Sequence, residues 1–188
     1  MTFKIRVYGD PVLKKKTEHI KEMTPELRRF IKDLSETMYS SSDGIGLAAP
    51  QVGESLRITV IDVDHINSEG KQSKKNLHVF INPEIEWESE GDVSYTEGCL
   101  SIPGVQGKVY RPESVKVRYR DKDFNEKIIE ADGLLARCLQ HEIDHLEGVL
   151  FVDRMSFANR AIIAGKLSRL RKLSRQGIDA EQLVKSMQ

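Results

Sequence analysis

The sequence has few of the features that mark several large protein classes. Two cysteines in 188 residues could form at most one disulfide bridge, whereas small secreted domains are often held together by several. No apolar run reaches the roughly 20 residues of a membrane-spanning helix, and the opening MTFKIRVYGD has no long apolar segment typical of a signal peptide. No linker rich in Pro, Gly or Ser divides the chain. We therefore expect a cytoplasmic protein, without a membrane segment, that forms one domain over residues 1–188.

The chain also lacks a net charge. It has 29 basic and 29 acidic side chains, so no global field favours nucleic acid or an acidic membrane. The apolar content of 39% suits one globular domain with a real core. Affinity for an anionic partner would have to come from a local patch.

Hydrophobic periodicity and end signals predict the secondary structure. One helix is expected to follow Thr24-Pro25, because threonine can cap a helix and proline fits its first turn. Further helices are expected over 133–146, with Asp132 as the cap, and over 157–175, ended by Gly177. Strands are predicted over 57–63, 77–81, 114–120 and 126–131. The first 23 residues are expected to be irregular, and 65–76 to form a polar, flexible loop.

The sequence HEIDH, residues 141–145, carries the strongest chemical pattern. In a helix, His141 and His145 lie one turn apart on the same face and can bind one ion. Glu142 lies about 100° further round the helix, near such an ion without having to bind it. A solvated helix that carries two histidines by chance is the alternative, and the inserted glutamate argues against it. The order of the predicted elements, a helix, many short strands and two helices, favours an α+β fold over a regular βαβ alternation. We expect antiparallel or mixed sheets of short strands to surround the helix over 133–146, with a C-terminal helix after it.

A catalytic metal site usually has three protein ligands and an open position. In one large protease class the third ligand follows as His-x-x-Gly-x-x-His, but here that position is Phe151. Another class uses a glutamate about twenty residues further on, but residues 154–178 contain no acidic residue. The remaining candidate is Cys99 in EGCLS. A lone cysteine is usually a buried apolar side chain, which suits Cys138 in the helix better than Cys99 next to a glycine.

The segment GIGLAAPQ, residues 44–51, is a third motif. It could be an ordinary glycine-rich turn. A phosphate-binding loop is disfavoured, because the segment lacks a Lys-Ser/Thr ending and follows a helix.

Together, the segments GIGLAAPQ, EGCLS and HEIDH resemble the GxGxAAxQ, EGCLS and HExDH motifs of the peptide deformylase family, in the family's order. The resemblance implies removal of the formyl group from the initiator methionine of new proteins. It implies a divalent transition metal, Fe²⁺ in many members, with Zn²⁺, Ni²⁺ or Co²⁺ able to occupy the site. It also implies formyl-methionyl nascent peptides as partners.

The motifs carry residue roles with them. The resemblance implies Cys99, His141 and His145 as metal ligands, and Glu142 as the catalytic acid and base. It implies that Gln51 and the N–H of Leu100 stabilise the oxyanion, while the backbone of Ile45, Gly46 and Gly98 aligns an extended substrate. A pocket for methionine is expected from Ile45, Tyr95, Leu134 and Cys138. Arg111 and Asp144 are candidates to orient a ligand histidine.

Two features depart from the pattern or add to it. Gln106 stands where many family members have arginine, which could pair with a carboxylate and brace the substrate pocket. Between 154 and 175 the chain carries seven basic residues and no acidic one: Arg154, Arg160, Lys166, Arg169, Arg171, Lys172 and Arg175. These could form a solvated face or dock on ribosomal RNA near the exit of the nascent chain.

Other functions compete with a deformylase. An HExxH endopeptidase lacks a conventional third ligand here. A non-enzymatic metal site would need four protein ligands, and three good ones are found. A cysteine hydrolase could use Cys99 as its nucleophile with a histidine as base, and chelator sensitivity would distinguish it.

Overall fold

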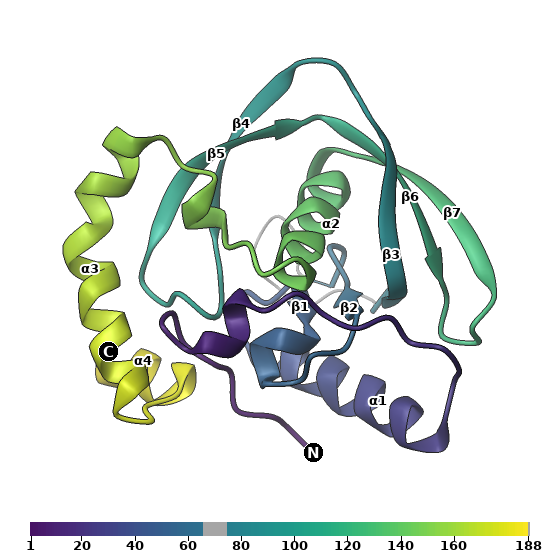
Figure 1. Ribbon diagram of the computed structural model, residues 1–188, viewed down its shortest axis with the longest axis horizontal. Coiled ribbons are helices and arrows are strands. Elements are labelled where there is room, and N and C mark those ends of the chain that lie inside the picture. Colours follow the sequence, from purple (N-terminus) through teal and green to yellow (C-terminus); the bar gives the residue numbers. More distant parts are fainter. Residues whose placement is uncertain (66–74, 188) are drawn as a thin grey trace.

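The structure is a computed structural model that describes residues 1–65 and 75–187 (Figure 1). Most of the loop predicted over 65–76 lies outside the described residues. The helical elements are η1 (Pro11–Lys14), α1 (Pro25–Ser40), η2 (Ala49–Val52), α2 (Gly133–Leu146), η3 (Phe151–Asp153), α3 (Phe157–Arg175) and α4 (Ala180–Met187). The strands are β1 (Gly46–Ala48), β2 (Ile58–Ile61), β3 (His78–Glu88), β4 (Asp92–Gly98), β5 (Gln106–Pro112), β6 (Ser114–Arg120) and β7 (Glu126–Asp132).

The strands form two antiparallel sheets. Five strands pair in the order β1-β2-β3-β6-β7, and β4 pairs with β5 in a separate ribbon. Figure 1 shows α2 at the centre of the molecule with the strands arranged around it. The buried residues of α2 include Leu139, Ile143 and Leu146, and the first two pack with Phe80 of β3. The expected α+β fold around the histidine-bearing helix is confirmed.

The ends of the long helices follow the signals in the sequence. The Thr24 hydroxyl oxygen accepts a hydrogen bond from the N–H of Leu27 at 3.2 Å, and α1 begins at Pro25 as predicted. Helix α3 ends at Arg175, and Gly177 follows with φ of +76°, a backbone conformation that glycine adopts at low cost. The prediction for Asp132 is wrong in part. It occupies the N-cap position of α2, but its side chain makes no capping bond.

The strands differ more from the prediction. β3 extends seven residues beyond the predicted end at Ile81. The strand continues through Asn82-Pro83, where its register with β6 is irregular. β2 is shorter than predicted, and β1, β4 and β5 were not predicted as strands. Helix α4 was also missed.

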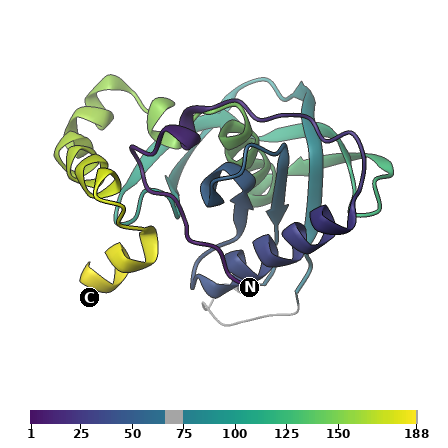
Figure 2. The ribbon, with the colours of Figure 1, turned by 60° about the horizontal axis from the view of Figure 1, so that its bottom comes forward.

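The C-terminal helices pack against the segment that carries Cys99. Leu167 of α3 and Leu183 of α4 are buried in the same apolar cluster as Ile102 and Val105. Figure 2 shows α3 and α4 together on one side of the sheets. Among the described residues, no helix is both long and apolar enough to span a bilayer.

Candidate active site

Helix α2 presents two histidine side chains to the interior. The rings of His141 and His145 lie with centroids 5.0 Å apart, at an interplanar angle of 71°. His145 is 1% exposed. Phe151, which stands where a protease would have its third ligand, is buried and stacks on the His141 ring with centroids 6.2 Å apart. Phe151 therefore packs against His141, and its side chain has no atom that could bind a metal ion.

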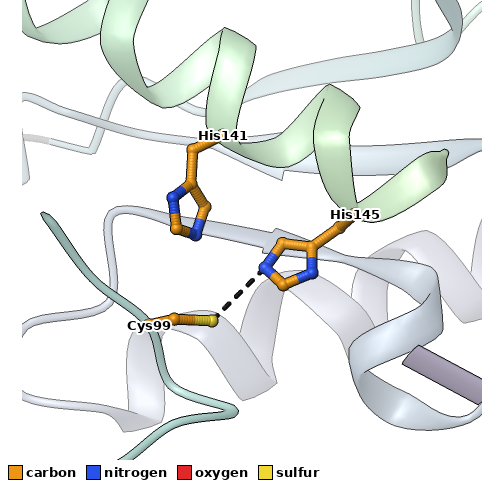
Figure 3. A group of neighbouring side chains, drawn as sticks. All are labelled: Cys99, His141 and His145. Carbon is orange, nitrogen blue, oxygen red and sulfur yellow. Dashed lines mark hydrogen bonds between the residues drawn. The ribbon is translucent and has the colours of Figure 1, made fainter. Parts of the chain in front are cut away.

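Cys99 approaches these histidines from the segment that follows β4 (Figure 3). Its Sγ lies 3.3 Å from Nε2 of His145. One potential ligand atom from each of Cys99, His141 and His145 lies within 4.8 Å of the other two. One thiolate and two imidazoles suit a transition metal, and three protein ligands leave a position for water or substrate. The donor set therefore fits the ion that the sequence motifs imply.

Glu97 fixes the orientation of His141. Its Oε2 lies 2.9 Å from Nδ1 of His141, which leaves Nε2 of that ring for an ion. Burial alone would raise the pKa of Glu97, but hydrogen bonds from His141 and Arg111 outweigh burial and hold it well below its usual range. Glu97 is thus a carboxylate that holds one tautomer of His141, as partners of metal-binding histidines do.

The two histidines have opposite electrostatic environments. Burial alone would lower the pKa of His141, but hydrogen bonds with Cys99 and Glu97 raise it to about 10. Burial, with the charge of His141, lowers the pKa of His145 well below its usual value. His145 is therefore a neutral imidazole with a lone pair to donate. Binding of an ion would release the proton from His141, since a ligand histidine must be neutral.

A buried network of charges surrounds Glu97. Arg111, which is 2% exposed, donates to Glu97 from Nε at 2.7 Å and from Nη1 to Asp144 at 2.6 Å. Arg137 donates to Glu97 at 3.1 Å. Arg154 donates to both oxygens of Asp144, at 2.6 and 2.5 Å. The network ties β4, β5 and α2 to the segment before α3.

Gln51 points its amide nitrogen at the thiol. The Oε1 atom accepts the N–H of Ala48 at 2.8 Å, so the NH₂ group must face the other way. It lies 3.4 Å from Sγ of Cys99 and 3.3 Å from Oγ of Ser101. Gln51 is 1% exposed, and this pairing fixes its donor beside the cluster.

Glu142 lies against β1 and β2 in an enclosed environment. It is 3% exposed, and Oγ1 of Thr59 donates to it at 3.5 Å. Burial raises its pKa to about 7, which suits a group that must take up and release a proton near neutral pH. A Cβ atom on Gly46 would lie 2.6 Å from Oε1 of Glu142 and 2.8 Å from Sγ of Cys138. Only glycine at position 46 lets β1 approach this closely.

One cleft of about 780 Å³ connects these residues. All six residues expected to bind substrate line it: Ile45, Gly46, Tyr95, Gly98, Leu134 and Cys138. Gln51, Cys99, Leu100, His141 and Glu142 line it as well. Cys138 is buried, whereas Tyr95 and Leu134 are 49% and 42% exposed and stand at the rim.

Comparison with known proteins identifies the family. The sequence model described as polypeptide deformylase matches residues 2–161. This chain belongs to the peptide deformylase family. It is 45% identical over 172 residues to the peptide deformylase of Cytophaga hutchinsonii, covering 92% of each chain. It is 53% identical over 151 residues to that of Caldanaerobacter subterraneus, covering 80% of this chain and 87% of the relative.

Solved peptide deformylases share the fold. A peptide deformylase from Legionella pneumophila superposes with a TM-score of 0.81 at 40% identity, covering 93% of this chain and 98% of the other. A plant peptide deformylase superposes with a TM-score of 0.84 at 36% identity, covering 94% of each chain. The agreement extends over nearly the whole length of each.

Sequence reasoning missed two residues of this deformylase site. The EGCLS motif by itself gives Glu97 no role, although alternation along a strand would put residues 97 and 99 on one side. Arg137 of α2 is the second residue. It donates a hydrogen bond to Glu97, which lies 40 residues earlier in the sequence. Arg111 and Asp144 were expected to orient a ligand histidine. Arg111 contacts Glu97 rather than a histidine.

Proposed function

We propose that this chain removes the N-formyl group from the initiator methionine of nascent polypeptides by metal-dependent hydrolysis, which releases formate. The observation that carries the proposal is the convergence of Cys99, His141 and His145, the first two of which line a cleft together with Glu142 and Gln51. Residues 1–188 are proposed to form one catalytic domain. A cytoplasmic location is proposed as well.

The ion would be held by Cys99, His141 and His145. Fe²⁺ is the proposed ion in the cell, with Zn²⁺, Ni²⁺ or Co²⁺ as alternatives, since a thiolate and two imidazoles favour transition ions over Mg²⁺ or Ca²⁺. When bound, such an ion lowers the pKa of water and polarises a carbonyl oxygen. Glu97 supports the site by keeping Nδ1 of His141 engaged.

Three groups of the chain are assigned to the reaction itself. Glu142 takes the proton of the attacking water and delivers it to the departing amine. The amide of Gln51 and the backbone N–H of Leu100 donate to the oxygen that becomes negative in the tetrahedral intermediate. Such donors are each worth about 3–4 kcal/mol in the transition state. The hydrogen bond that Oε1 of Gln51 accepts from the N–H of Ala48 keeps the Gln51 donor in place before substrate arrives.

The rest of the cleft positions the peptide. The backbone of Ile45, Gly46 and Gly98 is proposed to align the substrate as an added strand. Tyr95, Leu134 and Cys138 are proposed to form the pocket for the methionine side chain, together with the side chain of Ile45.

Formate release from formyl-Met-Ala-Ser by anaerobically purified protein tests the proposal. We expect turnover that a chelator abolishes and that added Fe²⁺ or Co²⁺ restores. Replacing the first residue by norleucine should preserve turnover, whereas leucine and lysine should reduce it. Chelator-resistant release would favour Cys99 as a nucleophile instead. Cleavage of an internal peptide bond would favour an endopeptidase, and equal turnover of all first residues would contradict the methionine pocket.

The ribosome is proposed as a docking partner through part of the basic segment. Three basic residues of this segment form hydrogen bonds or ion pairs within the protein: Arg154 with Asp144, Arg160 with Asp153 and Arg171 with Tyr8. Arg169, Lys172 and Arg175 are exposed on α3 and make no ion pair with the described residues. The surface proposed to contact the ribosome is therefore limited to the second half of α3.

Replacing Arg169, Lys172 and Arg175 together by serine should weaken ribosome binding and reduce its salt dependence. Each lost phosphate contact lowers the slope of log K against log salt by about 0.7–0.9. Cosedimentation with ribosomes at several salt concentrations measures this. A triple serine variant at Lys21, Lys122 and Lys127, all exposed elsewhere, is the control. Equal binding by the two variants would contradict the docking surface.

A further inference from the structure

The active-site cleft extends beyond the proposed catalytic residues to the C-terminal helices. Lys166 of α3 and Val184 of α4 line the same cleft as His141 and Glu142. The neighbouring residues Leu167 and Leu183 are buried in the core cluster that includes Ile102. Core packing therefore fixes the backbone from which Lys166 reaches the cleft. The α3 helix is a wall of the site as well as a basic surface.

Lys166 carries a charge that the described part of the chain does not neutralise. Its side chain is exposed and makes no hydrogen bond or ion pair with the described residues. Arg137 and His141 are the other basic residues of the cleft lining; Arg137 donates to Glu97 and to the carbonyl of Val93, and His141 pairs with Glu97. Gln106, also in the lining, is neutral. Lys166 is thus the cation of the cleft that remains available to a ligand.

Acidic groups in the lining occupy other positions. Glu97 is committed to the buried network, and Glu142 lies beside β1 and β2. Asp43 belongs to the segment before β1 and accepts a hydrogen bond from the Ser42 hydroxyl at 3.4 Å. Asp43 makes no ion pair with the described residues, Lys166 included. The cleft thus presents a cation on the α3 wall.

The later residues of the peptide have to leave the catalytic residues along the cleft that Lys166 also lines. A formyl group is the first group of its chain, so the residues after methionine must run outward from Glu142 along the cleft. An extended peptide advances about 3.3 Å per residue, and its side chains alternate between the two walls. We propose that Lys166 is a specificity-determining residue that selects formyl-methionyl peptides with an acidic side chain in the second or third position, an inference that rests on the function proposed above.

Peptides that differ only in one charge test this proposal. The series is formyl-Met-Asp-Ala-amide and formyl-Met-Ala-Asp-amide, each beside its Asn counterpart, with the C-terminal amide removing the free carboxylate. The wild-type protein is expected to prefer Asp over Asn at one of the two positions by about two- to fivefold in kcat/KM, the range of an exposed ion pair. The preference should act through KM rather than kcat and weaken as salt is added.

The variants K166Q and K166E identify the source of the preference. K166Q should remove it and K166E should reverse it, while turnover of the Asn peptides stays within about twofold in both. The matched control is K172E, the same charge reversal at an exposed residue of α3 outside the cleft lining. An Asp to Asn ratio that is the same in K166E and the wild type would overturn the proposal. So would an equal change in K172E.

A second pair of peptides separates an acidic side chain from a chain terminus. Formyl-Met-Ala-Asn is compared as the free acid and as the amide. A preference that depends on Lys166 only for the free acid would overturn side-chain selection in favour of terminal carboxylate recognition. Absence of formate release from every peptide would contradict the proposed function, and turnover of the Asn peptides distinguishes that failure from a failure of Lys166.

Discussion

Replacing Glu142 by glutamine is expected to lower kcat/KM for a formyl-methionyl peptide by about 10²–10⁴-fold, the usual contribution of a positioned acid or base. Glutamine keeps the shape of the side chain and its contact with Thr59, but it cannot accept and return a proton. Because burial raises the pKa of Glu142 to about 7, the wild-type carboxyl is suited to both transfers. Single-turnover measurement of formate release would report the loss directly.

Two measurements make this prediction specific. Metal content per protein should be unchanged in E142Q, because Glu142 is not one of the three clustered ligands. The variant E90Q, which makes the same change at an exposed residue of the turn after β3, should retain wild-type turnover. Undiminished formate release by E142Q would refute the assigned role. A parallel loss of metal would show that Glu142 supports the ion site instead.

The helices could be predicted from the sequence because their signals are local. A cap, a first-turn proline and a terminal glycine lie within a few residues of the ends they set, as Thr24, Pro25 and Gly177 show. The β4-β5 ribbon gives no such signal. Six of the seven residues of β4 are exposed, so the alternation of apolar and polar residues that reveals a half-buried strand is missing.

The candidate metal ligands could be predicted from the sequence only in part. The spacing of His141 and His145 is a property of one helix, whereas Cys99 lies 46 residues before His145 and was placed by elimination and family resemblance. Glu97 and Arg137 come together through strand β4 packing on α2, and no local pattern encodes that contact. The same reason applies to Lys166, whose place at the cleft depends on the burial of Leu167 and Leu183.

Replacing Arg111 by methionine is expected to destabilise the protein by about 3–5 kcal/mol, since it removes one charged partner from each of two buried carboxylates, Glu97 and Asp144. Arg137 still contacts Glu97, and Arg154 still contacts Asp144, so the loss should fall toward the lower end. Urea unfolding of the metal-loaded protein would measure it. Arg118 offers a matched control, because it also binds two carboxylates, those of Glu84 and Glu86, but is 39% exposed. R118M should cost no more than about 1 kcal/mol per exposed pair.

Replacing Arg111 by methionine should also weaken metal binding, although Arg111 contacts none of the three proposed ligands. Loss of Arg111 frees the Glu97 carboxylate to move, and Glu97 holds His141 by a bond of 2.9 Å. Changes at such supporting partners typically lower metal affinity about 10- to 100-fold. Competition with a chelator measures this in R111M and in R118M, which should keep wild-type affinity. Equal stability and affinity in the two variants would show that the buried network supports neither the fold nor the ion. A loss of stability and metal affinity in R111M alone would mean that the position of His141 depends on the charge of Arg111, which acts on His141 through Glu97.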